Sequence, residues 1–185
     1  MTSWTKLLAL RGLRTLTATD RITSDSSLDR VNQGVMFHVS SLASLASDAN
    51  LDLILTTPAN DFIHMVVEGA CQGNAELALY EDAVATGGTT VVPRNQKRTS
   101  SLLWGGTIVV DPSVSDAGTR LALQLLPGGN KSNSSGTVQT VDGEWILRAS
   151  TRYLIRLTNR VTGQAQSASI GCTFYSSPEV FDTKS

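Results

Sequence analysis

The stretch Glu144-Trp-Ile-Leu-Arg-Ala-Ser-Thr-Arg-Tyr-Leu-Ile-Arg-Leu-Thr-Asn159 indicates the fold class. It predicts two short strands with a break at Ala149–Ser150. Period-two alternation gives the second strand two different faces. The apolar face is made of Tyr153, Ile155 and Leu157. The polar face is made of Arg152, Arg156 and Thr158. We expect the apolar face to pack inward and the two arginines to stay in solvent.

The chain on both sides of this stretch continues as short segments separated by turn residues. The expected strands are Gly34–Ser40, Asp52–Thr57, Phe62–Gly69, Ala75–Glu81, Thr89–Val92, Ser100–Trp104, Thr107–Val110, Thr119–Leu126, Thr137–Val141, Trp145–Leu147, Arg152–Thr158 and Ser167–Tyr175. Ser41–Asn50 also fits a helical turn. No long helical pattern separates the strands, so a parallel sheet of βαβ units is disfavoured. The sequence predicts an all-β, antiparallel, jelly-roll-like β-sandwich with an N-terminal arm.

Three regions are expected: an arm and linker over residues 1–33, a β-sandwich domain over 34–178 and a C-terminal tail over 179–185. The arm carries leucines and basic residues in a weak helical periodicity. They are Leu7, Leu8, Leu10, Leu13 and Leu16, with Lys6, Arg11 and Arg14. Thr17–Asp29 is polar and has no apolar pattern. The arm is either a disordered terminus or a segment that becomes ordered on a partner.

Composition excludes several classes of function. The chain has 185 residues, 41% of them hydrophobic, and a formal net charge of −1, whereas a general nucleic-acid binder needs a basic excess. No secretory signal and no apolar run long enough to span a bilayer are evident, so we expect no membrane association and synthesis in a cytoplasm. Cys71 and Cys172 lie in apolar stretches. Buried free thiols are expected, with one bridge between adjacent strands as the alternative.

Catalytic, metal and cofactor motifs are not found in the sequence. His38 and His64 fall in predicted strands without other residues at metal-ligand spacing. The Gly-rich loop Pro127–Gly136 lacks the P-loop spacing, and there is no G-x-S-x-G or H-E-x-x-H. The carboxylates offer no reason to select a glycosidase pair. We therefore expect a protein that is not an enzyme and that needs no cofactor.

Two further features allow either a structural or a functional interpretation. Trp104 and Trp145 lie in apolar segments, and either core packing or an interface would suit them. The densest basic cluster, Arg94, Lys97 and Arg98, lies in Pro93–Ser100. It is either a solvated loop or a contact for an acidic surface.

A series of short motifs follows in a recognisable order. They are Thr56-Thr57-Pro58, His64, Leu79-Tyr80-Glu81-Asp82, Gly87-Gly88-Thr89, Asn95-Gln96-Lys97-Arg98, Glu144-Trp145-Ile146-Leu147 and the strand Thr151–Asn159. Their order and spacing over Gly34–Tyr175 resemble those of tailed-bacteriophage virion proteins of the head decoration, cement or head-fibre type. None of the motifs is specific alone.

The resemblance implies a non-enzymatic capsid decoration protein, made in the bacterial host cytoplasm and located on the capsid surface. Its partners would be the major capsid protein, where capsid subunits meet, and copies of itself, as a homotrimer. The expected capsid-contact residues are Leu7, Leu10, Arg11, Leu13, Arg14, Arg94, Lys97 and Arg98. The alternative is a receptor- or carbohydrate-binding module of a tail fibre or spike, with Trp104, Trp145 or Tyr153 as stacking platforms.

Overall fold

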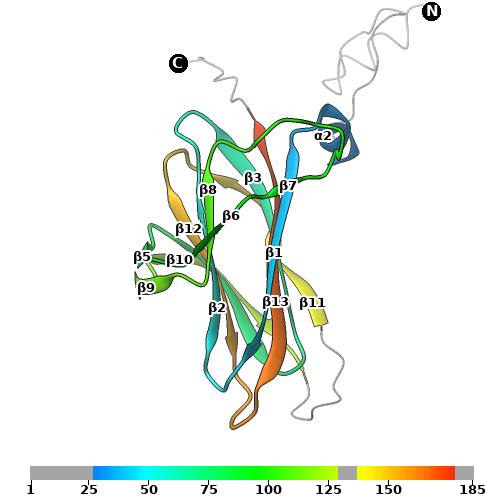
Figure 1. Cartoon of the computed structure of the whole chain (residues 1–185). Helices are drawn as coiled ribbons and strands as arrows, with labels where there is room; N and C mark the ends of the chain where they lie inside the picture. Colours follow the sequence, from blue (N-terminus) through cyan, green and yellow to red (C-terminus); the bar gives the residue numbers. More distant parts are fainter. Residues whose placement is uncertain (1–26, 129–136, 178–185) are drawn as a thin grey trace, which may run out of the picture.

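Two antiparallel sheets face each other across a single hydrophobic core (Figure 1). The computed structural model describes residues 27–128 and 137–177. The first sheet has the strand order β11–β3–β13–β1–β7. These strands are β1 (Met36–Leu45), β3 (Phe62–Cys71), β7 (Arg94–Asn95), β11 (Thr137–Leu147) and β13 (Gln166–Ser177).

The second sheet has the order β10–β4–β12–β2–β8–β6. Its strands are β2 (Asn50–Thr56), β4 (Ala75–Glu81), β6 (Thr89–Val91), β8 (Thr107–Val110), β10 (Thr119–Leu126) and β12 (Arg152–Asn159). A two-stranded sheet of β5 (Val84–Thr86) and β9 (Ser113–Asp116) projects beside it (Figure 1). The described residues also contain one helix, α2 (Ser27–Gln33), at the end of the sandwich where β1 begins (Figure 1).

The strand pairing is nested, because early strands pair with late ones. β1 lies beside β13, β2 beside β12, and β4 between β12 and β10. Such long-range antiparallel pairing wraps the chain around its own core. The all-β, antiparallel sandwich predicted from the sequence is confirmed. Its jelly-roll form stays a prediction.

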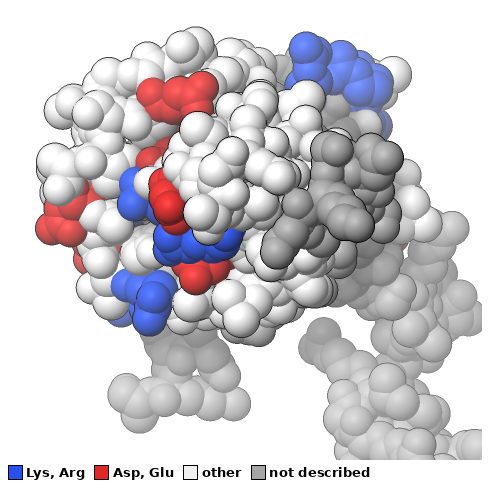
Figure 2. Space-filling model, turned by 90° about the horizontal axis from the view of Figure 1, so that it is seen from below, with Lys and Arg blue, Asp and Glu red and all other residues white. Residues whose placement is uncertain are grey.

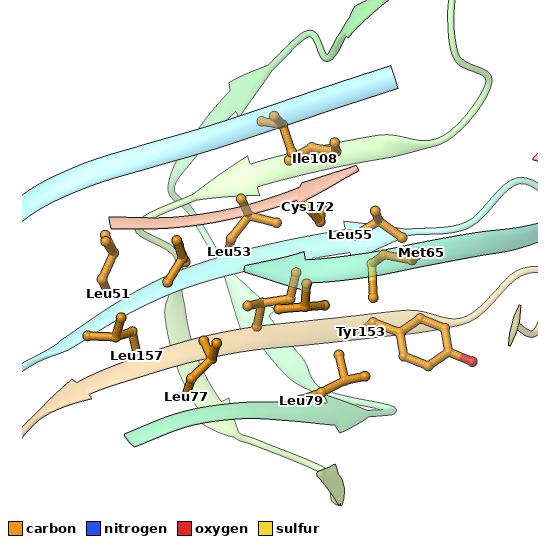
Figure 3. Packing of buried hydrophobic residues seen from close by; sticks show 14 of the residues in the cluster. Leu51, Leu53, Leu55, Met65, Leu77, Leu79, Ile108, Tyr153, Leu157 and Cys172 are labelled. Atoms are coloured by element: carbon orange, nitrogen blue, oxygen red, sulfur yellow. The ribbon is translucent and has the colours of Figure 1, made fainter. Parts of the chain in front are cut away.

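The core is built from the alternate residues of facing strands (Figure 3). Tyr153, Ile155 and Leu157 of β12 are buried and pack there, as the alternation in that strand predicts. The opposite sheet contributes a second stripe, which ends in Cys172 and Phe174. A shift of any of these strands by one residue would turn its buried side chains toward solvent. The alternation therefore determines the register in which each strand pairs.

The outer face of β12 is less exposed than expected. Leu154 is buried there with Ile54 and Ala83, in a small apolar cluster that β5 and β9 cover. Arg156 is only partly exposed because its guanidinium is paired with the carboxylate of Asp52. The expectation that both arginines of this strand stay in solvent is therefore wrong for Arg156, because period-two alternation does not reveal what covers the outer face.

Several expected element boundaries are wrong. The ambiguous segment 41–50 continues β1 to Leu45, where the strand still pairs with Gln166, rather than forming a helical turn. Ser100–Trp104 is irregular rather than a strand, and the hydroxyl of Ser100 accepts a hydrogen bond from the backbone of Leu102. The two strands expected at 137–141 and 145–147 are one strand, β11, with a register shift between Thr140 and Glu144.

The two cysteines are free and buried, as expected from the sequence. They lie on adjacent strands, where Cys71 is opposite Ala168 and Cys172 is opposite Val67. The four-residue offset separates them by about 13 Å along the strands, given a rise of roughly 3.3 Å per residue. A disulfide needs Cα atoms within about 7 Å, so this register excludes the bridge between adjacent strands that the sequence left open.

Candidate functional site

The end of the sandwich that carries α2 gathers the contact residues that the sequence predicted within the described chain. The helix ends at Gln33 and is followed by Gly34, which has a φ of 75° and donates its backbone N–H to the carbonyl of Val31 at 2.9 Å. This left-handed position favours glycine and turns the chain directly into β1. Residues 27–33 of the expected arm and linker are thus a helix that packs against the sandwich.

Asn95 connects this turn to the long segment between β6 and β8. Its buried side chain donates to the carbonyl oxygen of Gly34 at 2.6 Å and accepts from the backbone N–H of Lys97 at 2.9 Å. The hydroxyl of Ser100 also donates a hydrogen bond to the carbonyl of Gly34, at 3.4 Å. The basic segment is therefore held against the junction of α2 and β1 rather than free in solvent.

The three basic candidates are exposed and lie close together in the chain. The ammonium of Lys97 donates to the backbone carbonyl of Asn32 in the last turn of α2 at 2.8 Å. Arg98 donates to the carbonyl of Asn95 at 3.3 Å, and Arg94 belongs to β7, which pairs with β1. The prediction of a solvated basic loop is correct as to exposure, but β7 makes part of this segment a strand.

Exposed leucines occur at the same end of the molecule. Leu28 of α2 is 65% exposed, and Leu103 in the segment between β7 and β8 is 76% exposed. We call the following set the arm-end surface: Leu28, Arg94, Lys97, Arg98, Leu102 and Leu103. It combines exposed apolar side chains with three exposed cations. The remaining candidates, Leu7, Leu10, Arg11, Leu13 and Arg14, lie outside the described residues.

A stack of side chains ties α2 to the outer face of the first sheet. The guanidinium of Arg30 lies 4.8 Å from the ring centroid of Tyr175, and that ring stacks on His64 with centroids 4.7 Å apart. Nδ1 of His64 lies 3.0 Å from Oε1 of Glu144. These contacts form a continuous row of side chains that connects α2 with β13, β3 and β11. The sequence did not predict this stack, because its four members lie far apart in the chain.

The three aromatic residues considered as stacking platforms belong to the core. Tyr153 is buried, and its hydroxyl donates to Glu81 at 2.8 Å and accepts from the backbone N–H of Arg148 at 2.9 Å. Trp104 packs on Phe174 with ring centroids 4.8 Å apart, and Trp145 packs on the same core. Tyr153 is thus enclosed by the protein, whereas Trp104 and Trp145 remain partly exposed.

A polar hollow of about 280 Å³ lies on the outer face of the second sheet. Arg156 donates from two nitrogens to Asp52, both at 2.7 Å, and this hydrogen bonding raises the pKa of the guanidinium against the opposing effect of burial. Arg160 bonds Glu76 at 2.6 Å and Asp48 at 3.2 Å. From the end opposite α2, basic and acidic side chains lie next to one another (Figure 2). The hollow is therefore lined by ion pairs that largely neutralise one another.

The histidines lie on the outer face of the first sheet, away from this hollow. Nδ1 of His38 is 3.2 Å from the hydroxyl of Thr173, and the residue lines a shallow hollow of about 130 Å³. Over residues 27–128 and 137–177, no group of three or more His, Cys, Asp or Glu residues could hold a metal ion. No helix in the same ranges is both long and apolar enough to cross a bilayer.

The comparisons with protein-family models and with curated proteins found no match for this chain.

Proposed function

We propose that the chain is a non-enzymatic capsid decoration or cement protein of a tailed bacteriophage, which binds the major capsid lattice and stabilises the head. The observation that carries the proposal is the arm-end surface. Lys97 and Arg98 are held by Asn95 and Asn32 beside α2, and Arg94 belongs to β7, which pairs with β1. The Leu- and Arg-rich part of the arm precedes α2 in the chain, with a polar linker between them. We infer that the arm and the basic segment contact one partner together.

The proposed mechanism is cementing of neighbouring capsid subunits. The arm leucines would bury apolar surface across a subunit boundary, each contributing about 1.5–3 kcal/mol before the cost of ordering the arm. The basic residues of the arm and of the arm-end surface would complement an acidic capsid surface, with more effect on rate and salt dependence than on affinity. The sandwich would then stand outward from the capsid.

Sedimentation with heads that lack the protein tests this proposal. We expect the full chain to co-sediment at a fixed stoichiometry, and a variant without residues 1–26 to stay in the supernatant. Arg94→Ala/Arg98→Ala should bind more weakly and with a shallower salt dependence, because two surface cations are lost. The matched control Arg120→Ala/Arg160→Ala removes the same charge from the outer face of the second sheet and should bind normally.

Two results would count against the proposal. Normal co-sedimentation of the truncated chain would show that the arm is not the anchor, and equal weakening by both double variants would show that the arm-end surface has no special role. The alternative, a receptor- or carbohydrate-binding module of a tail fibre or spike, has the polar hollow around Arg156 as its best site. It predicts attachment to tails rather than heads.

A further inference from the structure

The polar hollow on the outer face of the second sheet has a small residue at its centre. Ala78 of β4 lies opposite Leu123 of β10 on one side and opposite Arg156 of β12 on the other. The neighbouring positions of β4 on the same face carry the longer side chains of Glu76 and Tyr80. The sheet surface is therefore lowest at Ala78, and the larger side chains around it enclose about 280 Å³.

The hollow lies toward the end of the sandwich opposite the arm-end surface. β1 begins beside α2 and runs to the other end, where Asp48 and Asn50 follow it in the chain (Figure 1). Both of these residues line the hollow. Tyr80 also lines it and packs against the apolar cluster that β5 and β9 cover. The hollow therefore extends from that cluster toward the end of the molecule farthest from α2.

Ion pairs hold most of the charged groups of the hollow in place. Arg156 donates two hydrogen bonds to the buried Asp52, both at 2.7 Å. Arg160 bridges Glu76 and Asp48, at 2.6 and 3.2 Å. Carboxylates accept several hydrogen bonds and a guanidinium has five N–H donors, so these pairs retain capacity for a ligand. A ligand would therefore meet donors and acceptors side by side that are already oriented.

Three other polar groups that line the hollow are not engaged in this way. Within residues 27–128 and 137–177, the guanidinium of Arg120 and the hydroxyl of Tyr80 have no hydrogen-bond partner. Asn50 accepts a hydrogen bond from the hydroxyl of Thr158 at 2.7 Å, which leaves the two N–H donors of its amide for a ligand. Arg120 is exposed and forms no ion pair in the same ranges. It is thus the cation that remains available to an anionic group of a ligand.

We propose that the hollow binds an acidic saccharide, a sugar that carries a carboxylate. Each sugar hydroxyl both donates and accepts hydrogen bonds, so it matches the neighbouring guanidinium and carboxylate groups. The sugar carboxylate pairs with Arg120 in a charge-assisted hydrogen bond, and the partly exposed ring of Tyr80 contacts the C–H groups of the sugar. The volume is near the lower limit of about 300 Å³ for ligand pockets, so it suits a short saccharide.

Other classes of ligand fit the hollow less well. An apolar ligand would remove charged side chains from water without replacing their hydrogen bonds. A nucleotide or polyphosphate would bring several negative charges close to Asp48 and Glu76, whereas Arg120 supplies a single positive charge without a carboxylate partner in the described chain. A ligand with one carboxylate and many hydroxyls avoids both costs.

The site is argued from the hollow alone, and none of its residues belongs to the arm-end surface. Its location in a particle rests on the proposed function. If the arm binds the capsid, the hollow lies at the far end of the sandwich and faces the surroundings of the head. Saccharide binding and capsid binding therefore fail separately: Arg120→Ala should lose the first and keep the second.

Isothermal titration calorimetry of the full chain tests the ligand class. The probes are digalacturonate, dimannuronate and N-acetylneuraminyl-lactose, which carry carboxylates on rings of different stereochemistry. We expect saturable binding of at least one of them, and about tenfold weaker binding of its methyl ester, which lacks the charge. Citrate at the same concentration should not displace the sugar. Absence of binding by all three probes, equal affinity for acid and ester, or displacement by citrate would overturn the proposal.

Substitutions and spectral shifts test the location. Arg120→Ala should weaken binding of the acid about tenfold, and its fold should be kept because Arg120 is exposed. Arg152→Ala is the matched control, since it removes an exposed cation from the same sheet face outside the hollow, and it should bind normally. In amide NMR spectra, titration should shift Ala78 and Arg156 but not His38 on the first sheet. Equal weakening by both variants, or shifts confined to the first sheet, would contradict the assignment.

Discussion

Tyr153 packs its ring in the core and hydrogen-bonds its hydroxyl to Glu81 and to the backbone of Arg148. Burial is the largest cause that raises the pKa of its phenol, to about 12 from the ordinary value of 10.0, and the neighbouring carboxylate of Glu81 adds to this. The folded state therefore favours the neutral phenol, whereas the unfolded chain ionises near pH 10. Its contribution to stability is complete below pH 10 and is lost as the pH rises through the folded value.

We expect the free energy of unfolding to decrease between pH 10 and pH 12, by up to about 1.4 kcal/mol per pH unit. Urea denaturation across this range measures the slope. Tyr153→Phe should flatten it, and at pH 9 this variant should be less stable by about 1–3 kcal/mol because the hydrogen-bond partners of the hydroxyl lose their bonds. Tyr80→Phe, on the outer face of β4, is the control and should keep the slope. A Tyr153→Phe variant with the wild-type slope would contradict this account.

The two cysteines are expected to be free thiols that do not react in the folded protein. Burial is the largest cause that raises the pKa of the Cys172 thiol well above its usual value, so the thiol stays protonated and unreactive. A thiol-specific reagent should label neither Cys71 nor Cys172 in the folded protein and both in urea. Reductant should leave the melting temperature unchanged. A disulfide across about 100 residues would instead contribute roughly 4–5 kcal/mol, so a large drop on reduction would refute the free-thiol assignment.

At the scale of elements, α2 is positioned by the stack that begins with Arg30 and Tyr175. We expect Tyr175→Ala to speed amide hydrogen exchange in α2, because a cation–π contact of about 0.5–2 kcal/mol is lost. Exchange in β12, at the centre of its sheet, should not change. Tyr175→Phe keeps the ring and should match the wild type. Unchanged exchange in α2 of the alanine variant would show that the stack does not hold the helix.

The elements that the sequence predicted well are those whose alternation is complete. Ala75–Glu81, Thr107–Val110 and Thr119–Leu126 have the observed boundaries of β4, β8 and β10. In each, one face packs on the core, so the apolar pattern follows directly from burial. The core positions of β12 and β13 could be assigned for the same reason.

The misplaced elements are those fixed by long-range contacts. β7 is two residues long and exists because it pairs with β1, whose paired residues lie 56 and 58 positions earlier in the chain. α2 ends just before Gly34, but its position depends on Asn95 and Tyr175. For the site, the sequence identified Arg94, Lys97 and Arg98 by charge density, but the role of Asn95 as their anchor became visible only in three dimensions.

On the scale of the whole molecule, the sandwich should fold without the arm. Its core lies between Met36 and Phe174, and α2 closes the end at which the arm begins. Deletion of residues 1–26 should leave a single cooperative β-rich thermal transition near the full-length temperature. Deletion of residues 1–33 also removes α2 and the Arg30–Tyr175 contact, so it should lower that temperature. Loss of the transition in the first variant would show that the arm contributes to the core.

The location of the chain in purified phage particles tests the central claim most directly. Gold-labelled antibody raised against residues 27–177 reports that location by electron microscopy, and particles from a deletion mutant provide the control. If the chain is a capsid decoration protein, the label lies over the head surface and disappears in the mutant. Label confined to the tail, or absent from intact particles, would contradict the account.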